Sequence, residues 1–167
     1  MSTIDASEER ALVEELSRAA LADALPEELG VFEARRDDFL EARGSIPPQE
    51  AGPDEPAGFG AEVVVLLTPY VVAGALAAVR FLGGLLADTV KDEAKPHVAK
   101  VVRRLFRLEE PATTSTSEQD ALAALPPDTV TRVREVVRTA CRQHGLDDDD
   151  AALVSDAVAG RLVLPES

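Results

Sequence analysis

The feature that most constrains this chain is a run of 17 uncharged residues at positions 63–79, VVVLLTPYVVAGALAAV. Residues 81–87, FLGGLLA, continue it, and residues 95–107 then carry five basic side chains and no acidic one. An apolar stretch of this length must leave water, either in a protein core or in a bilayer. The order, apolar first and basic second, is typical of a membrane-seeking segment.

Charge divides the chain into three parts. Residues 1–58 carry 15 acidic and 5 basic side chains, residues 59–108 carry 4 and 7, and residues 109–167 carry 12 and 5. The net charges are −10, +3 and −7, within a whole-chain charge of −14. The average therefore hides a basic, apolar centre between two acidic flanks. We expect the acidic flanks to bind a protein partner.

The length of the apolar run makes a membrane span marginal. A helix of 17 residues extends about 25 Å, whereas the hydrocarbon core is about 30 Å thick. Extended over residues 61–87 the helix is long enough, provided that Arg80 reaches the interface or a protein-lined interior. Pro69 is then expected to kink it. Gly74 and Ala78 form a small-xxx-small pair, which lets helices pack closely in membranes.

A basic amphipathic helix is predicted within residues 91–108, KDEAKPHVAKVVRRLFRL. Its apolar residues recur at helical spacing and form one stripe, and its basic residues fall on the opposite side. The stripe consists of Val98, Val101, Val102, Leu105 and Phe106, and the basic face of Lys100, Arg103, Arg104 and Arg107. Helices of this kind lie along anionic bilayer surfaces.

An anionic membrane surface is accordingly the first predicted partner. The predicted membrane-binding residues are Val63, Leu66, Leu67, Tyr70, Val72, Leu76, Phe81, Leu82, Leu85, Lys100, Arg103, Arg104, Phe106 and Arg107. In this hypothesis the protein is a membrane anchor or a membrane-acting effector. Nucleic acid is not expected as a partner, because a strongly acidic chain repels a polyanion outside the basic patch.

The alternative hypothesis is structural. The apolar run then forms the buried centre of a soluble all-α protein, with residues 98–106 packed on it and their basic face neutralised by the acidic flanks. The protein would be an adaptor or assembly protein, with its apolar segment in its own core or in a homo- or hetero-oligomeric interface.

The N-terminal flank is predicted to be a helical hairpin. A first helix over residues 8–25, capped by Asp5 or Ser7, is followed by a second over residues 27–42. Residues 44–60 then hold four Pro and four Gly with neither a helical nor a strand period. This composition indicates a solvated linker.

The C-terminal flank is predicted to be a small helical unit. A short helix ends at Pro126, and Asp128 can cap the next one. The apolar face of that helix consists of Val130, Val133, Val137, Ala140 and Cys141. Gly145 with Leu146 supplies a stop of the Schellman type, and four aspartates, residues 147–150, introduce the last helix.

The predicted fold is therefore all-α, with small helical units around a central apolar helix or helical hairpin that a basic amphipathic helix follows. Aromatic residues make up only 4% of the chain, so the core must consist of Ala, Val and Leu, which suits helix packing. The predicted parts are an acidic hairpin arm at 1–43, a Pro/Gly linker at 44–60, the apolar segment with the basic helix at 61–108, a linker at 109–117 and a C-terminal helical unit at 118–167.

No sequence motif indicates catalysis, a cofactor or a metal. Cys141 and His144 are interpreted as a buried small residue and a helix-end histidine, and His97 as a surface residue at a helix start. A calcium loop starting at Asp147 would need Gly and Glu at its sixth and twelfth positions, which are Ala152 and Val158. We therefore predict that the protein is not an enzyme.

Cysteine usage and the N-terminal sequence bear on localisation. A single cysteine fits a reducing compartment, and the acidic, polar start MSTIDASEER lacks the basic and apolar regions of a cleaved export signal. The prediction is a bacterial protein of the cytoplasm or of the inner membrane surface.

Overall fold

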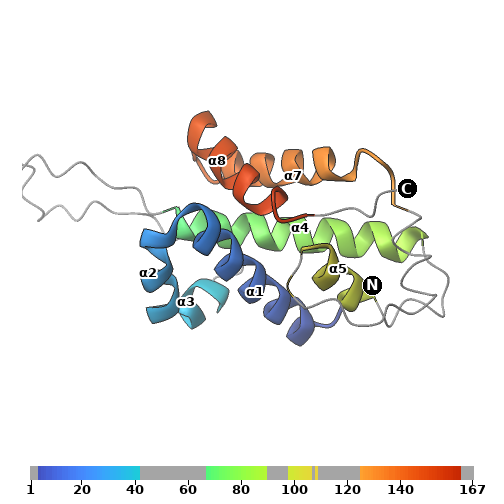
Figure 1. The fold of residues 1–167 in the computed structure, drawn as a ribbon, viewed down its shortest axis with the longest axis horizontal. Coiled ribbons are helices and arrows are strands. Elements are labelled where there is room, and N and C mark those ends of the chain that lie inside the picture. Colours follow the sequence, from blue (N-terminus) through green and yellow to red (C-terminus); the bar gives the residue numbers. More distant parts are fainter. Residues whose placement is uncertain (1–3, 42–66, 90–97, 107, 109–124, 163–167) are drawn as a thin grey trace, which may run out of the picture.

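The computed structural model describes residues 4–41, 67–89, 98–106, 108 and 125–162 (Figure 1). Within these ranges the chain forms helices and no strand, so the predicted all-α fold is confirmed. The helices are α1 (Ala6–Ala24), α2 (Leu29–Ala34), α3 (Arg36–Glu41), α4 (Thr68–Thr89), α5 (Val98–Leu105), α7 (Thr129–Gln143) and α8 (Asp148–Ala159), with a 3-10 turn at Pro26–Glu28. The predicted linkers, the short helix before Pro126 and His97 lie outside the described residues.

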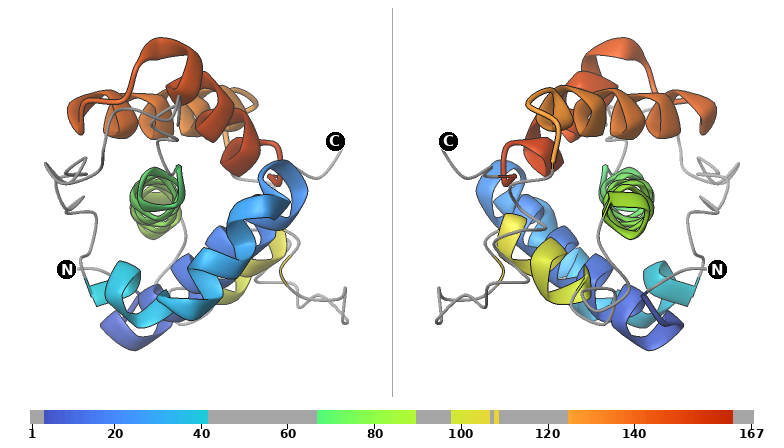
Figure 2. Two further views of the ribbon diagram at one scale, coloured as in Figure 1. Left: turned by 90° about the vertical axis from the view of Figure 1, so that its left-hand side faces the viewer. Right: turned by 90° about the vertical axis from the view of Figure 1, so that its right-hand side faces the viewer.

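The central helix α4 lies between two covers (Figures 1 and 2). The N-terminal helices α1 to α3, together with α5, cover one side, and the hairpin of α7 and α8 covers the other. Because α4 contributes to the contacts with both covers, the described part of the apolar run, from Leu67 on, is the shared core of the molecule.

The start of α4 is fixed by a buried carboxylate from the N-terminal cover. Glu28 is 7% exposed, and its Oε1 accepts hydrogen bonds from the backbone N–H and the hydroxyl of Thr68, both at 2.8 Å. A carboxylate at this position satisfies a free N–H and complements the helix dipole. Pro69 lies in the first turn of α4, so it helps to begin this helix, in contrast to the kink that a helix over residues 61–87 would require.

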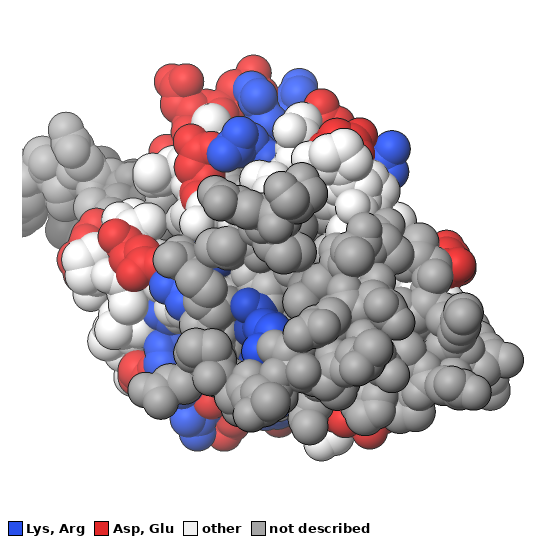
Figure 3. Space-filling model, turned by 45° about the vertical axis from the view of Figure 1, so that its right-hand side comes forward, with Lys and Arg blue, Asp and Glu red and all other residues white. Residues whose placement is uncertain are grey.

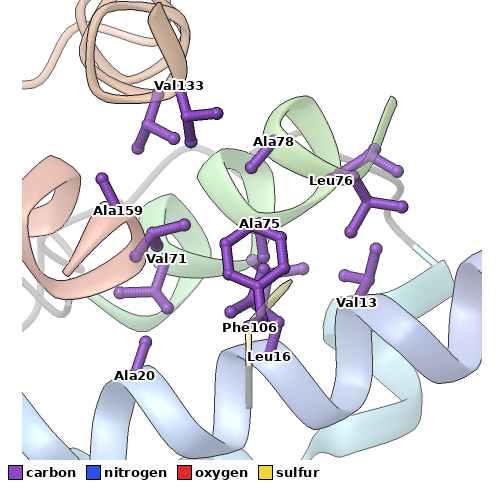
Figure 4. Close-up of a cluster of buried hydrophobic side chains, with 14 of the residues drawn as sticks. Val13, Leu16, Ala20, Val71, Ala75, Leu76, Ala78, Phe106, Val133 and Ala159 are labelled. Atoms are coloured by element: carbon purple, nitrogen blue, oxygen red, sulfur yellow. The ribbon is translucent and has the colours of Figure 1, made fainter. Parts of the chain in front are cut away.

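Small side chains let the covers approach α4 closely. A Cβ added at Gly74 would lie 2.8 Å from Cγ1 of Val137 in α7 and 3.6 Å from Cγ1 of Val154 in α8. Figure 4 shows Ala78 directed toward Val133 of α7 and Leu76 beside Val13 of α1. The small-xxx-small pair is therefore used for packing inside the protein.

The N-terminal cover follows the predicted pattern in part. Asp5 caps α1 as predicted, because its Oδ1 accepts a hydrogen bond from the N–H of Glu8 at 2.8 Å. The second predicted helix is broken into the turn, α2 and α3, with Arg35 in a non-helical conformation between the last two. The break brings the rings of Phe32 and Phe39 into stacked contact, 6.4 Å between centroids.

The C-terminal hairpin is closed by a Schellman turn, as predicted. Gly145 adopts φ 89°, the N–H of Leu146 bonds to the carbonyl of Cys141, and the N–H of Gly145 bonds to that of Arg142. Asp147 caps α8 through the N–H of Asp150 at 2.8 Å. The cap predicted from Asp128 is wrong: its carboxylate instead binds Arg132, one turn into α7.

Candidate functional site

The predicted membrane-binding residues are mostly inside the protein. Leu67, Tyr70, Val72, Leu76, Leu82 and Phe106 are buried, whereas Phe81, Leu85, Arg103 and Arg104 are half-buried. Val63, Leu66, Arg107 and the side chain of Lys100 lie outside the described residues. In this conformation most of the described apolar set is occupied by contacts with the protein itself.

The apolar stripe predicted for the basic helix is present and fully enclosed. Val98, Val101, Val102, Leu105 and Phe106 expose at most 1% of their surface each. On the other side of α5, Nε of Arg103 donates to Glu15 of α1 at 2.9 Å. The stripe therefore contributes to the core, and an acidic residue of the N-terminal arm pairs with the basic face.

Two further carboxylates of α1 pair with arginines of other elements. Glu9 pairs with Arg80 of α4 at 3.2 Å, and Asp23 with Arg161, just after α8, at 2.7 Å. Glu9 and Arg161 expose only 18% and 16% of their side chains, so each pair is partly buried, and the two pairs join α1 to α4 and to the end of α8. Acidic and basic side chains are interspersed on the described part of the face that Figure 3 shows.

An open groove lies between α4 and α7. It measures about 480 Å³ and is lined by Ala77, Phe81, Arg132, Glu135, Val136, Thr139, Ala140 and Gln143. Apolar side chains of the two helices form much of its lining, with the polar residues of α7 along it. A second pocket, lined by α1, α3 and α4, holds only about 50 Å³ and is too small for an organic ligand.

The sequence predicted that Phe81 and Ala140 belong to apolar segments, but it did not predict that they line the same groove. Neither residue is fully buried. The sequence held a weak indication of this groove. Positions 77, 81 and 85 of α4 are apolar although they lie beyond the face of the helix that its neighbours cover. The partner residues on α7 depend on the packing of segments far apart in the chain.

Cys141 lies in the core, as its apolar position predicted. It is fully buried, and its Sγ lies 3.8 Å from the carbonyl oxygen of Tyr70. Burial raises the pKa of the thiol to about 12, so it is uncharged and unreactive near neutral pH. His144 is exposed at the end of α7. Among the described residues, no group of three His, Cys, Asp or Glu side chains could hold a metal ion.

The stretch Thr68–Asp88 is long and apolar enough to cross a membrane, judged by length and composition alone. Most of it is buried, and the core helix of a soluble protein meets the same criterion. No protein-family model matches the chain, and no curated protein or solved structure shows significant similarity to it.

Proposed function

We propose that this protein is a non-catalytic adaptor or assembly protein whose apolar central segment is its own core. The observation that carries the proposal is the enclosure of α4 and α5: their apolar faces pack on α1, α7 and α8, and acidic residues of α1 pair with Arg80 and Arg103. Leu153 is the one large apolar side chain that is exposed among the described residues. A described surface with one exposed large apolar side chain is typical of a protein that is stable in water.

The groove between α4 and α7 is the proposed partner site. Phe81, Val136 and Ala140 offer an apolar floor, and Glu135 lies beside it without an ion pair to any described residue. The matching partner is an amphipathic helix of another protein, with small or aliphatic residues on one face and a Lys or Arg next to them. Burial of the floor would supply affinity, and the charge opposite Glu135 would supply orientation.

A photo-crosslinking amino acid in place of Phe81 tests this proposal in the native cells. We expect a discrete protein adduct from position 81 and none from the same amino acid at Arg35, an exposed position on the opposite cover. The partner found in this way should then bind the purified protein, and Glu135→Lys should weaken that binding by about tenfold. Adducts to lipid alone from position 81 would contradict the adaptor proposal.

The second candidate function is action on a membrane after the bundle opens. The observation that favours it is the composition of α4, which stays apolar at its less covered positions Ala77, Phe81 and Leu85, where a core helix of a soluble protein usually carries polar residues. Flotation of the purified protein with anionic vesicles tests it. Vesicle binding that becomes stronger when phosphatidylglycerol is added would support this candidate. Absence of binding would contradict it and favour the adaptor proposal.

A further inference from the structure

Helix α7 combines a buried apolar face with an exposed row of arginines. It carries four arginines and one glutamate, and its residues Val133, Val137 and Cys141 are fully buried. Arg132, Arg134 and Arg142 expose 49%, 49% and 59% of their side chains. A helix of this composition suits the surface of an anionic bilayer, provided that its apolar face can leave α4.

Three of the four arginines of α7 are paired with aspartates, Arg132 with Asp128 at 2.9 Å and the other two with α8. Arg134 pairs with Asp156 and Arg142 with Asp148, both at 3.1 Å. Arg138 lies midway between these two arginines along α7, and Ala152, which has no charge, lies midway between their aspartates along α8. Arg138 is exposed and makes no ion pair with any described residue. It is therefore available to an external anion.

The two covers of α4 are held in different ways. The N-terminal cover is tied to α4 by the buried Glu28–Thr68 hydrogen bonds and by the Arg80–Glu9 pair. The described contacts between the hairpin and α4 are apolar, apart from the long contact of Cys141 with the Tyr70 carbonyl. The hairpin is also joined to α1 by the Arg161–Asp23 pair at 2.7 Å, which must break when the hairpin separates. Water makes those apolar contacts favourable, whereas lipid tails replace them without a hydrophobic cost. A buried carboxylate cap, in contrast, becomes stronger in an apolar medium.

We propose that α7 is the element that binds an anionic membrane, after the α7–α8 hairpin separates from α4. The inference rests on the second function proposed above. Near the bilayer, Val133 and Val137 enter the acyl boundary, Arg138 meets lipid phosphates, and the vacated face of α4 around Gly74 turns to lipid. The N-terminal cover stays on α4, because its ties are polar.

A disulfide between α4 and α7 tests the separation. The distance from an added Cβ at Gly74 to Cβ of Val137 is 3.8 Å, which matches the usual separation of about 3.8 Å in disulfides. The variant Gly74→Cys/Val137→Cys/Cys141→Ala provides a locked oxidised form and a free reduced form of one protein. The probe is vesicles of phosphatidylcholine with phosphatidylglycerol, and vesicles of phosphatidylcholine alone are the control.

A charge variant tests the role of α7 independently of the lock. Arg138→Glu should retain the fold in circular dichroism. The control is Arg35→Glu, a charge reversal at an exposed arginine of the N-terminal cover. Because Arg35 pairs with Asp38 and lies over the ring of Phe39, the fold of this variant is checked in the same way. We expect wild type and the reduced lock to bind anionic vesicles, and the oxidised lock and Arg138→Glu to bind about tenfold more weakly. Arg35→Glu should bind nearly as wild type does.

Each of the other outcomes contradicts one specific part of the proposal. If wild type binds anionic vesicles but the oxidised lock or Arg138→Glu binds equally well, the role of α7 is wrong and membrane action stands. If wild type binds no vesicles, membrane action itself is wrong, and the inference fails with it.

Discussion

At the scale of single residues, the buried position of Cys141 predicts how much stability its side chain contributes. Because its thiol is buried and makes only a long contact, Cys141→Ala should lower the free energy of unfolding by about 1–2 kcal/mol. Urea titration followed by circular dichroism measures this. The thiol of the folded wild type should also resist alkylation until the protein unfolds, and rapid alkylation without denaturant would contradict its buried position.

Cys141 also predicts a pH dependence of stability with a definite sign. Its folded pKa of about 12 is raised from the ordinary value of 9.0 by burial. The stability that the buried thiol contributes is therefore complete below the ordinary pKa and is lost as the pH rises toward 12. Between about pH 9 and about pH 12 the wild type should lose stability relative to Cys141→Ala, by at most about 1.4 kcal/mol per pH unit. Parallel curves for the two proteins would contradict this.

Glu28 is the residue on which the start of α4 depends. Glu28→Gln keeps the shape of the side chain but removes the charge that faces two donors of Thr68. The free energy of unfolding should fall by about 1–3 kcal/mol. The matched control is Glu27→Gln, an exposed neighbour in the same turn, which should change stability by less than about 0.5 kcal/mol. Equal effects of the two variants would show that the cap is dispensable.

At the scale of elements, two glycines of α4 predict opposite effects of the same substitution. Gly84→Ala adds a Cβ in open space and should stabilise the helix by about 0.5–1 kcal/mol. Gly74→Ala places the Cβ 2.8 Å from the stiff side chain of Val137 and should destabilise the protein. Thermal unfolding of both variants measures the difference. Stabilisation by both would mean that α7 is not held closely against α4.

The sequence predicted those elements that depend on residues close together in the chain. The cap at Asp5, the Schellman turn at Gly145 and the apolar stripe of α5 each follow from residues within two helical turns. The break at Arg35 was not predicted, because no Gly or Pro marks it in the sequence, although it allows Phe32 to stack on Phe39. The cap by Glu28 was equally hidden, since it joins residues 40 positions apart.

At the scale of the whole molecule, Leu76 distinguishes a core helix from a membrane segment. It is 8% exposed and lies beside Val13 of α1. In a bundle that is stable in water, Leu76→Arg should bury an unpaired charge and unfold or aggregate the protein. Gly84→Arg, at an exposed position of the same helix, should leave it folded. Size-exclusion chromatography without detergent measures both, and a soluble, folded Leu76→Arg variant would contradict the core assignment.

The candidate site was less predictable than the fold. The apolar run and the basic stripe were evident in the sequence, but hydropathy alone does not distinguish burial in protein from burial in lipid. What favours the protein core is the pairing of Arg80 and Arg103 with Glu9 and Glu15 of α1. These partners are more than 70 positions away in the chain.

The order of the two covers along the chain has a consequence for synthesis. Helices α1 to α3 leave the ribosome before α4, whereas the hairpin begins only at Thr129 and completes the enclosure of α4 once it has been translated. A nascent chain that ends before the hairpin therefore presents Val71, Gly74 and Ala78 of α4 to the surroundings. During that interval a chaperone or a membrane surface competes with the protein's own C-terminal half for the same helix.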